Sequence, residues 1–150
     1  MMKPEKCRDD FFMRTEAINN MKMKYYIATK LENHAKHNLL MHSLSMLGHE
    51  CTYDWTKHGP VYSHGLLRVR EVATLETQGV LDADMVIVLW PSGRGTHVEL
   101  GIALGAGIPV HFISDVDGHH EATAETCAFY HHPLVTRHRT QMDFLEAITA

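Results

Sequence analysis

The chain has 150 residues, and its 14 lysines and arginines against 18 aspartates and glutamates give a formal charge of −4 with histidine neutral. Hydrophobic residues make up 45% and charged residues 21%, which is typical of a globular domain and excludes a disordered chain. The mild acidic balance offers no broad positive surface to a nucleic acid polymer, and no apolar run approaches the ~20 residues of a membrane helix. We therefore expect one domain with a substantial core and no nucleic acid or membrane partner.

Residues 1–22 have mixed charges and no continuous apolar stretch, so they predict an N-terminal extension and not a secretory signal. Residues 23–150 are expected to form the functional domain. The three cysteines, Cys7, Cys51 and Cys127, are widely spaced and form no C-x-x-C pair, so no disulfide framework is expected. Together these features favour a cytoplasmic protein.

From residue 24 onward, strand-like and helix-like segments alternate along the chain. Apolar runs with aromatic or β-branched residues predict strands at residues 25–29, 50–55, 85–90, 109–114 and 127–132. Apolar residues at helical spacing predict helices at residues 33–47, 66–81, 96–107 and 142–150. Such alternation is typical of an α/β fold with a parallel sheet, and right-handed crossovers place helices on both faces. We expect a three-layer α/β fold with a five-stranded parallel sheet.

Ligands of such sheets bind beyond the carboxyl ends of the strands, where the strand order reverses. The residues expected there are Thr29 and Lys30 after the first strand, Asp54 and Trp55 after the second, residues 91–95 after the third, and Ser114 and Asp115 after the fourth.

Residues 84–110 predict a strand, a glycine-rich loop, a helix and another strand. Gly93 and Gly95 allow a tight turn and the close approach of a ligand, and the helix N-terminus presents free N–H groups to that ligand. The loop is not a G-x-G-x-x-G motif, because residue 98 is valine, and it follows the third strand and not the first. A dinucleotide-binding site is therefore disfavoured.

Two glutamates near these positions are candidates for chemistry. Glu99 lies in the first turn of the predicted helix, although T-x-x-E from Thr96 to Glu99 also fits a capping box with no catalytic role. Glu76 shares an apolar helix face with Val72 and Val80, where a carboxylate is costly unless it is paired or functional. The alternative for Glu76 is a side chain that reaches solvent or pairs with a basic group.

The 13 histidines show no metal-binding spacing. His34 and His37 lie one turn apart without a third ligand nearby, and no H-E-x-x-H or Cys/His zinc pattern occurs. We expect no metal and no cofactor, and most histidines are expected at the surface. His97 and Arg94 differ from the rest because they flank a helix N-terminus, where an anion such as a 5'-phosphate binds favourably.

The segment GRGTHVELGIALGAGIPV (93–110) after an Ala-Asp-hydrophobic strand resembles the nucleoside 2-deoxyribosyltransferase family, whose relatives include 2'-deoxynucleoside 5'-monophosphate N-glycosidases. YYIATKLE, GHECTYDWT and FYHHPLVTR also resemble members of this family, and the resemblance covers residues 24–148. It implies a flavodoxin-like fold with a five-stranded parallel sheet. It also implies cleavage of an N-glycosidic bond through a covalent glycosyl-glutamate intermediate.

The resemblance implies three catalytic residues. Glu99 falls on the nucleophilic glutamate, and Tyr26 falls on the tyrosine that orients it. Glu76 falls on the aspartate that protonates the leaving base, which is a departure from the family pattern. Gly93 takes the place of an acidic or hydroxyl residue of the loop, and Ser92 lies one position earlier. The family also implies a homo-oligomer, a dimer or larger, in which a neighbouring subunit completes the site.

The expected substrate is a small nucleoside or nucleotide, and two nearby carboxylates suit the chemistry of retaining glycosidases. Capture of the sugar by another base gives a transferase, and capture by water gives an N-glycosidase, for which Arg94, His97 and Lys30 would hold the phosphate. A non-catalytic nucleotide-binding module is a third alternative. The expected substrate-binding residues are Thr29, Lys30, Asp54, Trp55, Ser92, Gly93, Arg94, Gly95 and His97. For Asp54 and Trp55, contact with the base competes with local capping and packing.

Overall fold

The computed structural model describes residues 21–150, so most of the predicted extension of residues 1–22 lies outside the described residues. The sheet contains β1 (Lys24–Ala28), β2 (Glu50–Cys51), β3 (Met85–Leu89), β4 (Val110–Ile113) and β5 (Val135–His138). All neighbouring strands are parallel, in the order β2-β1-β3-β4-β5. This is the strand order of flavodoxin-like folds, and it reverses direction between β1 and β3. The predicted fold class is confirmed.

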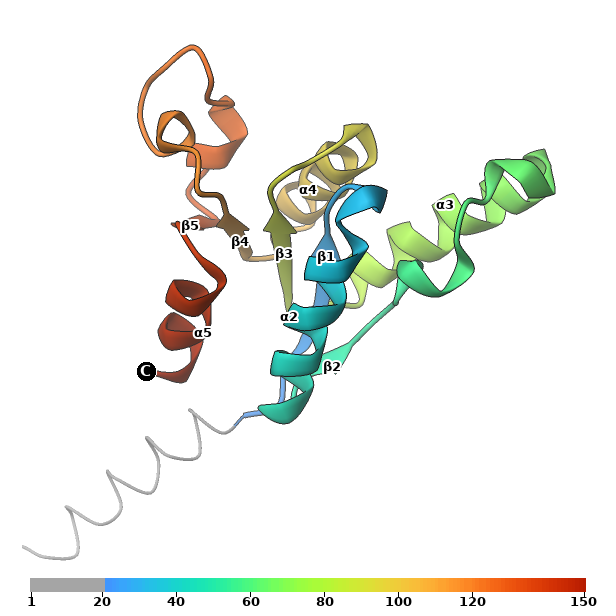
Figure 1. The fold of residues 1–150 in the computed structure, drawn as a ribbon, viewed down its shortest axis with the longest axis horizontal. Helices are drawn as coiled ribbons and strands as arrows, with labels where there is room; N and C mark the ends of the chain where they lie inside the picture. Colours follow the sequence, from blue (N-terminus) through green and yellow to red (C-terminus); the bar gives the residue numbers. More distant parts are fainter. Residues whose placement is uncertain (1–20) are drawn as a thin grey trace, which may run out of the picture.

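Four helices cover the two faces of the sheet (Figure 1). They are α2 (His34–Met46), α3 (Leu66–Leu81), α4 (Arg94–Gly105) and α5 (Gln141–Thr149). Alternate side chains of β1 enter two separate cores, because successive residues of a strand point to opposite faces. Tyr26 packs with residues of α3 and α4, whereas Tyr25 packs with residues of α2 and α5. Within residues 21–150, no helix combines the length and the apolar character that crossing a membrane requires.

The fifth strand lies later in the chain than predicted. Residues 127–132 were expected to form it, but Ala128–His131 is a 3-10 helix, and β5 is Val135–His138. Tyr130 of this segment contributes to the core without joining the sheet, since it is buried and stacks on Phe112 of β4, whereas Phe129 is exposed. The second strand is also shorter than predicted, because Trp55 already begins a 3-10 helix.

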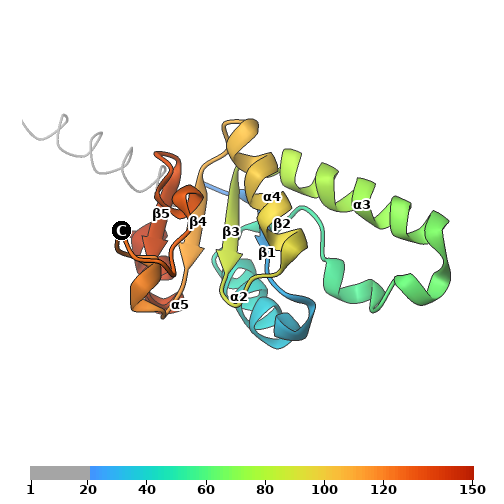
Figure 2. The ribbon, with the colours of Figure 1, turned by 90° about the horizontal axis from the view of Figure 1, so that it is seen from above.

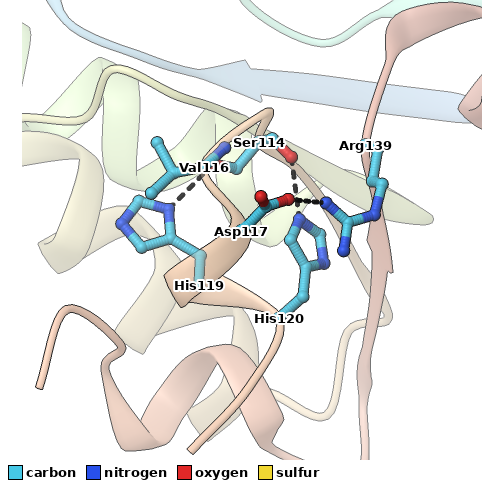
Figure 3. Close-up of polar contacts among 6 residues, drawn as sticks. All are labelled: Ser114, Val116, Asp117, His119, His120 and Arg139. Carbon is cyan, nitrogen blue, oxygen red and sulfur yellow. Dashed lines mark hydrogen bonds and ion pairs between the residues drawn. The ribbon is translucent and has the colours of Figure 1, made fainter. Parts of the chain in front are cut away.

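A long connection from β4 to β5 is tied to the sheet at Ser114 (Figure 3). The Ser114 hydroxyl accepts the Val116 N–H at 3.2 Å and lies 2.8 Å from Nδ1 of His119. Nε2 of His120 lies 2.8 Å from the Ser114 carbonyl oxygen. Because the Ser114 hydroxyl contacts both Val116 and His119, it holds the start of this connection in place at the end of β4.

Helix α3 lies in close contact with residues of the sheet region at Gly79. A Cβ atom there would lie 2.8 Å from Cβ of Tyr53 and 3.0 Å from Cδ2 of Tyr26, which is closer than a side-chain carbon tolerates. The Thr52 hydroxyl also donates to the Gly79 carbonyl at 2.6 Å. A glycine at this position therefore sets the distance between α3 and β1.

We expect Gly79→Ala to lower the free energy of unfolding by about 1–3 kcal/mol, because the added methyl group overpacks the contact with Tyr26 and Tyr53. Gly101→Ala is the matched control in α4, where a Cβ atom meets nothing within 4 Å. That control should gain up to about 1 kcal/mol from helix propensity. Urea denaturation of both variants measures the difference, and equal stability of the two would contradict the close-contact argument.

Candidate active site

A pocket of about 250 Å³ opens where the strand order reverses, between the carboxyl end of β1, the loop after β2, helix α3 and the start of α4. The sequence-predicted residues that line it are Thr29, Lys30, Trp55, Glu76, Gly93, Gly95 and Glu99. They come from four separate parts of the chain, so the fold places the predicted residues together at the edge where parallel sheets bind ligands.

Glu99 is the buried acid of this pocket, with 9% of its surface exposed. Its Oε2 atom has no hydrogen-bond partner within residues 21–150. Burial and the negative charge of Glu76 raise the pKa of Glu99 to about 8, although the Tyr26 hydroxyl acts in the opposite direction. A carboxyl group in such surroundings gains and loses its proton near neutral pH, a property that is common among catalytic groups.

Tyr26 lies on β1, an interior strand of the sheet, and its side chain is beside Glu99 of α4. Tyr26 has no exposed surface. Burial raises the pKa of Tyr26 far above its ordinary value, and the charge of Glu99 raises it further. The phenol therefore stays protonated. Its hydroxyl, like Oε2 of Glu99, has no hydrogen-bond partner among residues 21–150. The two groups are neighbours, and Tyr26 can donate to Glu99 with a small adjustment.

Glu76 is the second carboxylate of the pocket and is half-buried on α3. Burial raises the pKa of Glu76 above its ordinary value. None of the three ion pairs among residues 21–150 involves Glu76, so the expected alternative of a basic partner is not what this structure shows. Two neighbouring carboxyl groups with raised pKa values can hold one proton between them.

The alternative in which Glu99 caps its own helix is wrong. Helix α4 begins at Arg94, two residues earlier than predicted, so Thr96 lies inside the helix and Glu99 in the second turn. The Thr96 hydroxyl instead accepts the Gly93 N–H at 3.0 Å. The Glu99 side chain is thereby left free to face the pocket.

Two residues predicted to contact the substrate, Asp54 and Trp55, form hydrogen bonds within the protein. Asp54 caps the 3-10 helix Trp55–His58, because its Oδ1 accepts the Thr56 N–H at 3.0 Å and the Thr56 hydroxyl at 2.5 Å. Trp55 is 5% exposed, and its Nε1 donates to the Ile27 carbonyl at 2.8 Å. Trp55 thus forms a fixed wall of the pocket, whereas Asp54 does not line it.

Three residues near the glycine-rich loop also lie outside the pocket lining. Arg94 is exposed, and the Ser92 hydroxyl donates to the Leu89 carbonyl at 3.4 Å. His97 contacts the Gly93 carbonyl through Nδ1 and the Tyr130 hydroxyl through Nε2, each at 2.8 Å. Thr29, which does line the pocket, donates to the Leu89 and Pro91 carbonyls and joins the ends of β1 and β3.

The loop after β2 contributes pocket residues that the sequence analysis assigned no role. Its members that line the pocket are His58, Gly59, Pro60, Val61 and Tyr62. Nε2 of His58 is buried without a hydrogen-bond partner in the described part of the chain, and its ring stacks on Tyr53. The position of this loop at the carboxyl end of the second strand was the signal for a ligand-facing segment.

The histidines differ from the expectation that most lie at the surface. His34, His42, His64, His97 and His131 are exposed, and the other eight are half-buried or buried. Histidines pack on other rings and form hydrogen bonds. For example, Nδ1 of His111 lies 2.9 Å from Nε2 of His138, and the two rings stack. Among residues 21–150 no group of three or more histidine, cysteine or acidic side chains could hold a metal ion.

Comparisons with known proteins support the fold. No protein-family model matches the sequence, and no curated protein matches it either. Among solved structures, the chain is similar to the CMP N-glycosidase BcmB of Clostridium botulinum, with a TM-score of 0.57 and 17% sequence identity. The match covers 83% of this chain and 96% of that chain.

We expect Glu99→Gln to stabilise the protein increasingly as the pH rises. The pKa of Glu99 is raised in the folded state, so folding binds protons and the wild type loses stability from about pH 4.5 to pH 8. Glutamine has no such proton to lose, and the gain should exceed about 1 kcal/mol at pH 8 and vanish near pH 5. Urea denaturation at both pH values measures it, and a gain that does not depend on pH would refute the raised pKa.

Proposed function

We propose that the protein cleaves the N-glycosidic bond of a nucleoside or nucleotide, with Glu99 as the nucleophile. The observation that carries this proposal is the buried Glu99 carboxyl group beside Glu76 and Tyr26, at the edge of a pocket of about 250 Å³. The resemblance of the sequence to nucleoside 2-deoxyribosyltransferases and the fold of the CMP N-glycosidase support it.

In the first step the ionised Glu99 attacks C1' of the sugar, and a bond forms between C1' and a glutamate oxygen. The bond from C1' to the base nitrogen breaks, and its electron pair stays on that nitrogen. Glu76 gives the departing base a proton, which its raised pKa allows it to carry. Tyr26 donates to the Glu99 oxygen that does not react and keeps the carboxylate oriented.

In the second step an acceptor attacks C1' and the bond to Glu99 breaks, which restores the carboxylate. The acceptor's proton returns to Glu76, so the site is ready for another cycle. A second base as the acceptor gives sugar transfer, and water gives hydrolysis. Transfer, the activity of the transferase family, is the first candidate.

Hydrolysis of a nucleoside 5'-monophosphate is the second candidate. Lys30 lines the pocket beside Gly93 and enters none of the ion pairs of residues 21–150. The N-terminus of α4 lies next to it and favours a bound anion. The positive charge of Lys30 and the N-terminus of α4 would therefore favour a phosphate at this end of the pocket.

A homo-oligomer stays a prediction of the family resemblance. Tyr62, Leu66 and Leu67 are strongly exposed apolar side chains at the start of α3, and Tyr62 also lines the pocket. A second copy of the chain that covers them would close the pocket on its open side.

We expect Glu99→Ala to abolish turnover without unfolding the protein. Wild type, Glu99→Ala and a matched control, Glu146→Ala on the opposite face of the sheet, are incubated with deoxynucleosides or deoxynucleoside monophosphates, with and without a free acceptor base. Chromatography of the products distinguishes exchange from hydrolysis. Full activity of Glu99→Ala would refute the mechanism, and a wild type that binds nucleotides without turnover would identify a binding module.

The pH dependence tests the roles of the two carboxyl groups. If the reaction needs one proton on the pair, kcat/KM of the wild type should fall above about pH 8, where Glu99 and Glu76 are both ionised. In Glu76→Gln the reaction needs only an ionised Glu99, so the remaining activity should rise with pH and level off. A decline above pH 8 in both proteins would contradict the assignment of Glu76 as the proton donor.

A further inference from the structure

The His97 side chain links Gly93 of the glycine-rich loop to Tyr130 in the core. Its Nδ1 lies 2.8 Å from the Gly93 carbonyl oxygen, and its Nε2 lies 2.8 Å from the Tyr130 hydroxyl. The rings of His97 and Tyr130 also stack, with centroids 5.9 Å apart and planes 29° apart. Both ring nitrogens are therefore engaged by protein groups and are not free for a phosphate.

The partners determine where the ring proton lies. A carbonyl oxygen only accepts hydrogen bonds, so Nδ1 of His97 carries the proton and donates it to Gly93. In the neutral ring Nε2 then accepts, and the Tyr130 hydroxyl donates to it. The contact thus specifies one tautomer of a neutral histidine.

Tyr130 is a firm anchor for this contact. It is 3% exposed, and its ring stacks on Phe112 of β4 with centroids 4.1 Å apart. The Tyr130 carbonyl accepts from Nη1 of Arg137 at 3.2 Å, and the ring of His119 contacts the Tyr130 ring edge-on. His119 is itself held by Ser114, as Figure 3 shows.

At the other end of the contact, Gly93 lines the pocket and is the N-cap residue of α4. Its carbonyl accepts twice from His97, from the side chain and from the backbone N–H at 3.2 Å, and its own N–H donates to Thr96. These bonds fix the first turn of α4. Glu99 follows His97 by two residues, so its position depends on the same turn.

We propose that His97 and Tyr130 are positioning residues, which fix the first turn of α4 so that Gly93 and Glu99 keep their places in the pocket. The inference rests on the proposed function for its kinetic test, and it assigns His97 no contact with the substrate. A phosphate-binding His97 would act on the substrate itself, and the two roles predict different kinetics.

The kinetic test uses His97→Ala, Tyr130→Phe and the double variant. Each single variant should lower kcat about ten- to a hundredfold for nucleosides and nucleotides alike, because a small displacement of a catalytic group is costly. The double variant should be no slower than the slower single variant, since both break one contact. His97→Asn should restore part of kcat, because its amide can still donate to the Gly93 carbonyl.

Tyr25→Phe is the matched control for the loss of a buried tyrosine hydroxyl. Tyr25 donates to the Met41 carbonyl in the core on the other face of the sheet, so this variant should keep kcat and KM. A rise of KM confined to monophosphates in His97→Ala, with unchanged kinetics in Tyr130→Phe, would overturn the proposal in favour of a phosphate ligand. Effects that add up in the double variant would also overturn it.

Nuclear magnetic resonance tests the contact even if the wild type shows no turnover. Nitrogen shifts of His97 should report a proton on Nδ1 and an unprotonated Nε2 that accepts a hydrogen bond. Tyr130→Phe should shift the Nε2 resonance and speed hydrogen exchange of the backbone amides of residues 95–97. A proton on Nε2, or amide exchange that Tyr130→Phe leaves unchanged, would overturn the proposal. Absent turnover with these signatures present would refute the proposed function and leave the contact established.

Discussion

The burial of the Glu99 carboxyl group is the constraint on which the site depends. A carboxylate shielded from water is unstable in its charged form, and here the charge of Glu76 adds to that cost. The Tyr26 hydroxyl opposes both effects, and β1, an interior strand of the sheet, holds this side chain fully buried against α3. The order of the strands, the close approach at Gly79 and the start of α4 at Arg94 all serve to bring these three side chains together.

The fold was largely predictable because its middle strand, β3, is apolar throughout and the strands on either side of it, β1 and β4, are mostly apolar. Residues 85–90 form a continuous apolar run, as a strand buried on both faces requires, and β3 lies within this range. The edge strand β5 gave no such signal, since three of its four residues, Thr136, Arg137 and His138, are polar, although Val135 and His138 are both buried. The preceding aromatic segment has the composition of a strand, but packing of Tyr130 on Phe112, 18 residues earlier, fixes a 3-10 turn instead.

The pocket was predictable to the extent that it follows from strand ends. Thr29, Lys30, Glu76 and Glu99 could be placed there because parallel strands bring their carboxyl ends to one edge. The hydrogen-bond partners of individual side chains could not be predicted from the sequence. The partner of His97 is 33 residues away at Tyr130, and the loop from His58 to Tyr62 has no pattern that distinguishes a pocket wall from an ordinary turn.

The close contact at Gly79 lies near the C-terminal end of α3, so any tilt of the helix would turn about this point. The helix extends away from the sheet toward its N-terminus, as seen from above (Figure 2). At about 1.5 Å per residue, Glu76 lies roughly 4.5 Å along the axis from Gly79, whereas Leu66 lies roughly 20 Å from it. A tilt of α3 about Gly79 would therefore move Leu66 about four times as far as it moves Glu76. The separation of Glu76 from Glu99 is therefore less sensitive to such a tilt than the position of the exposed N-terminal end of α3.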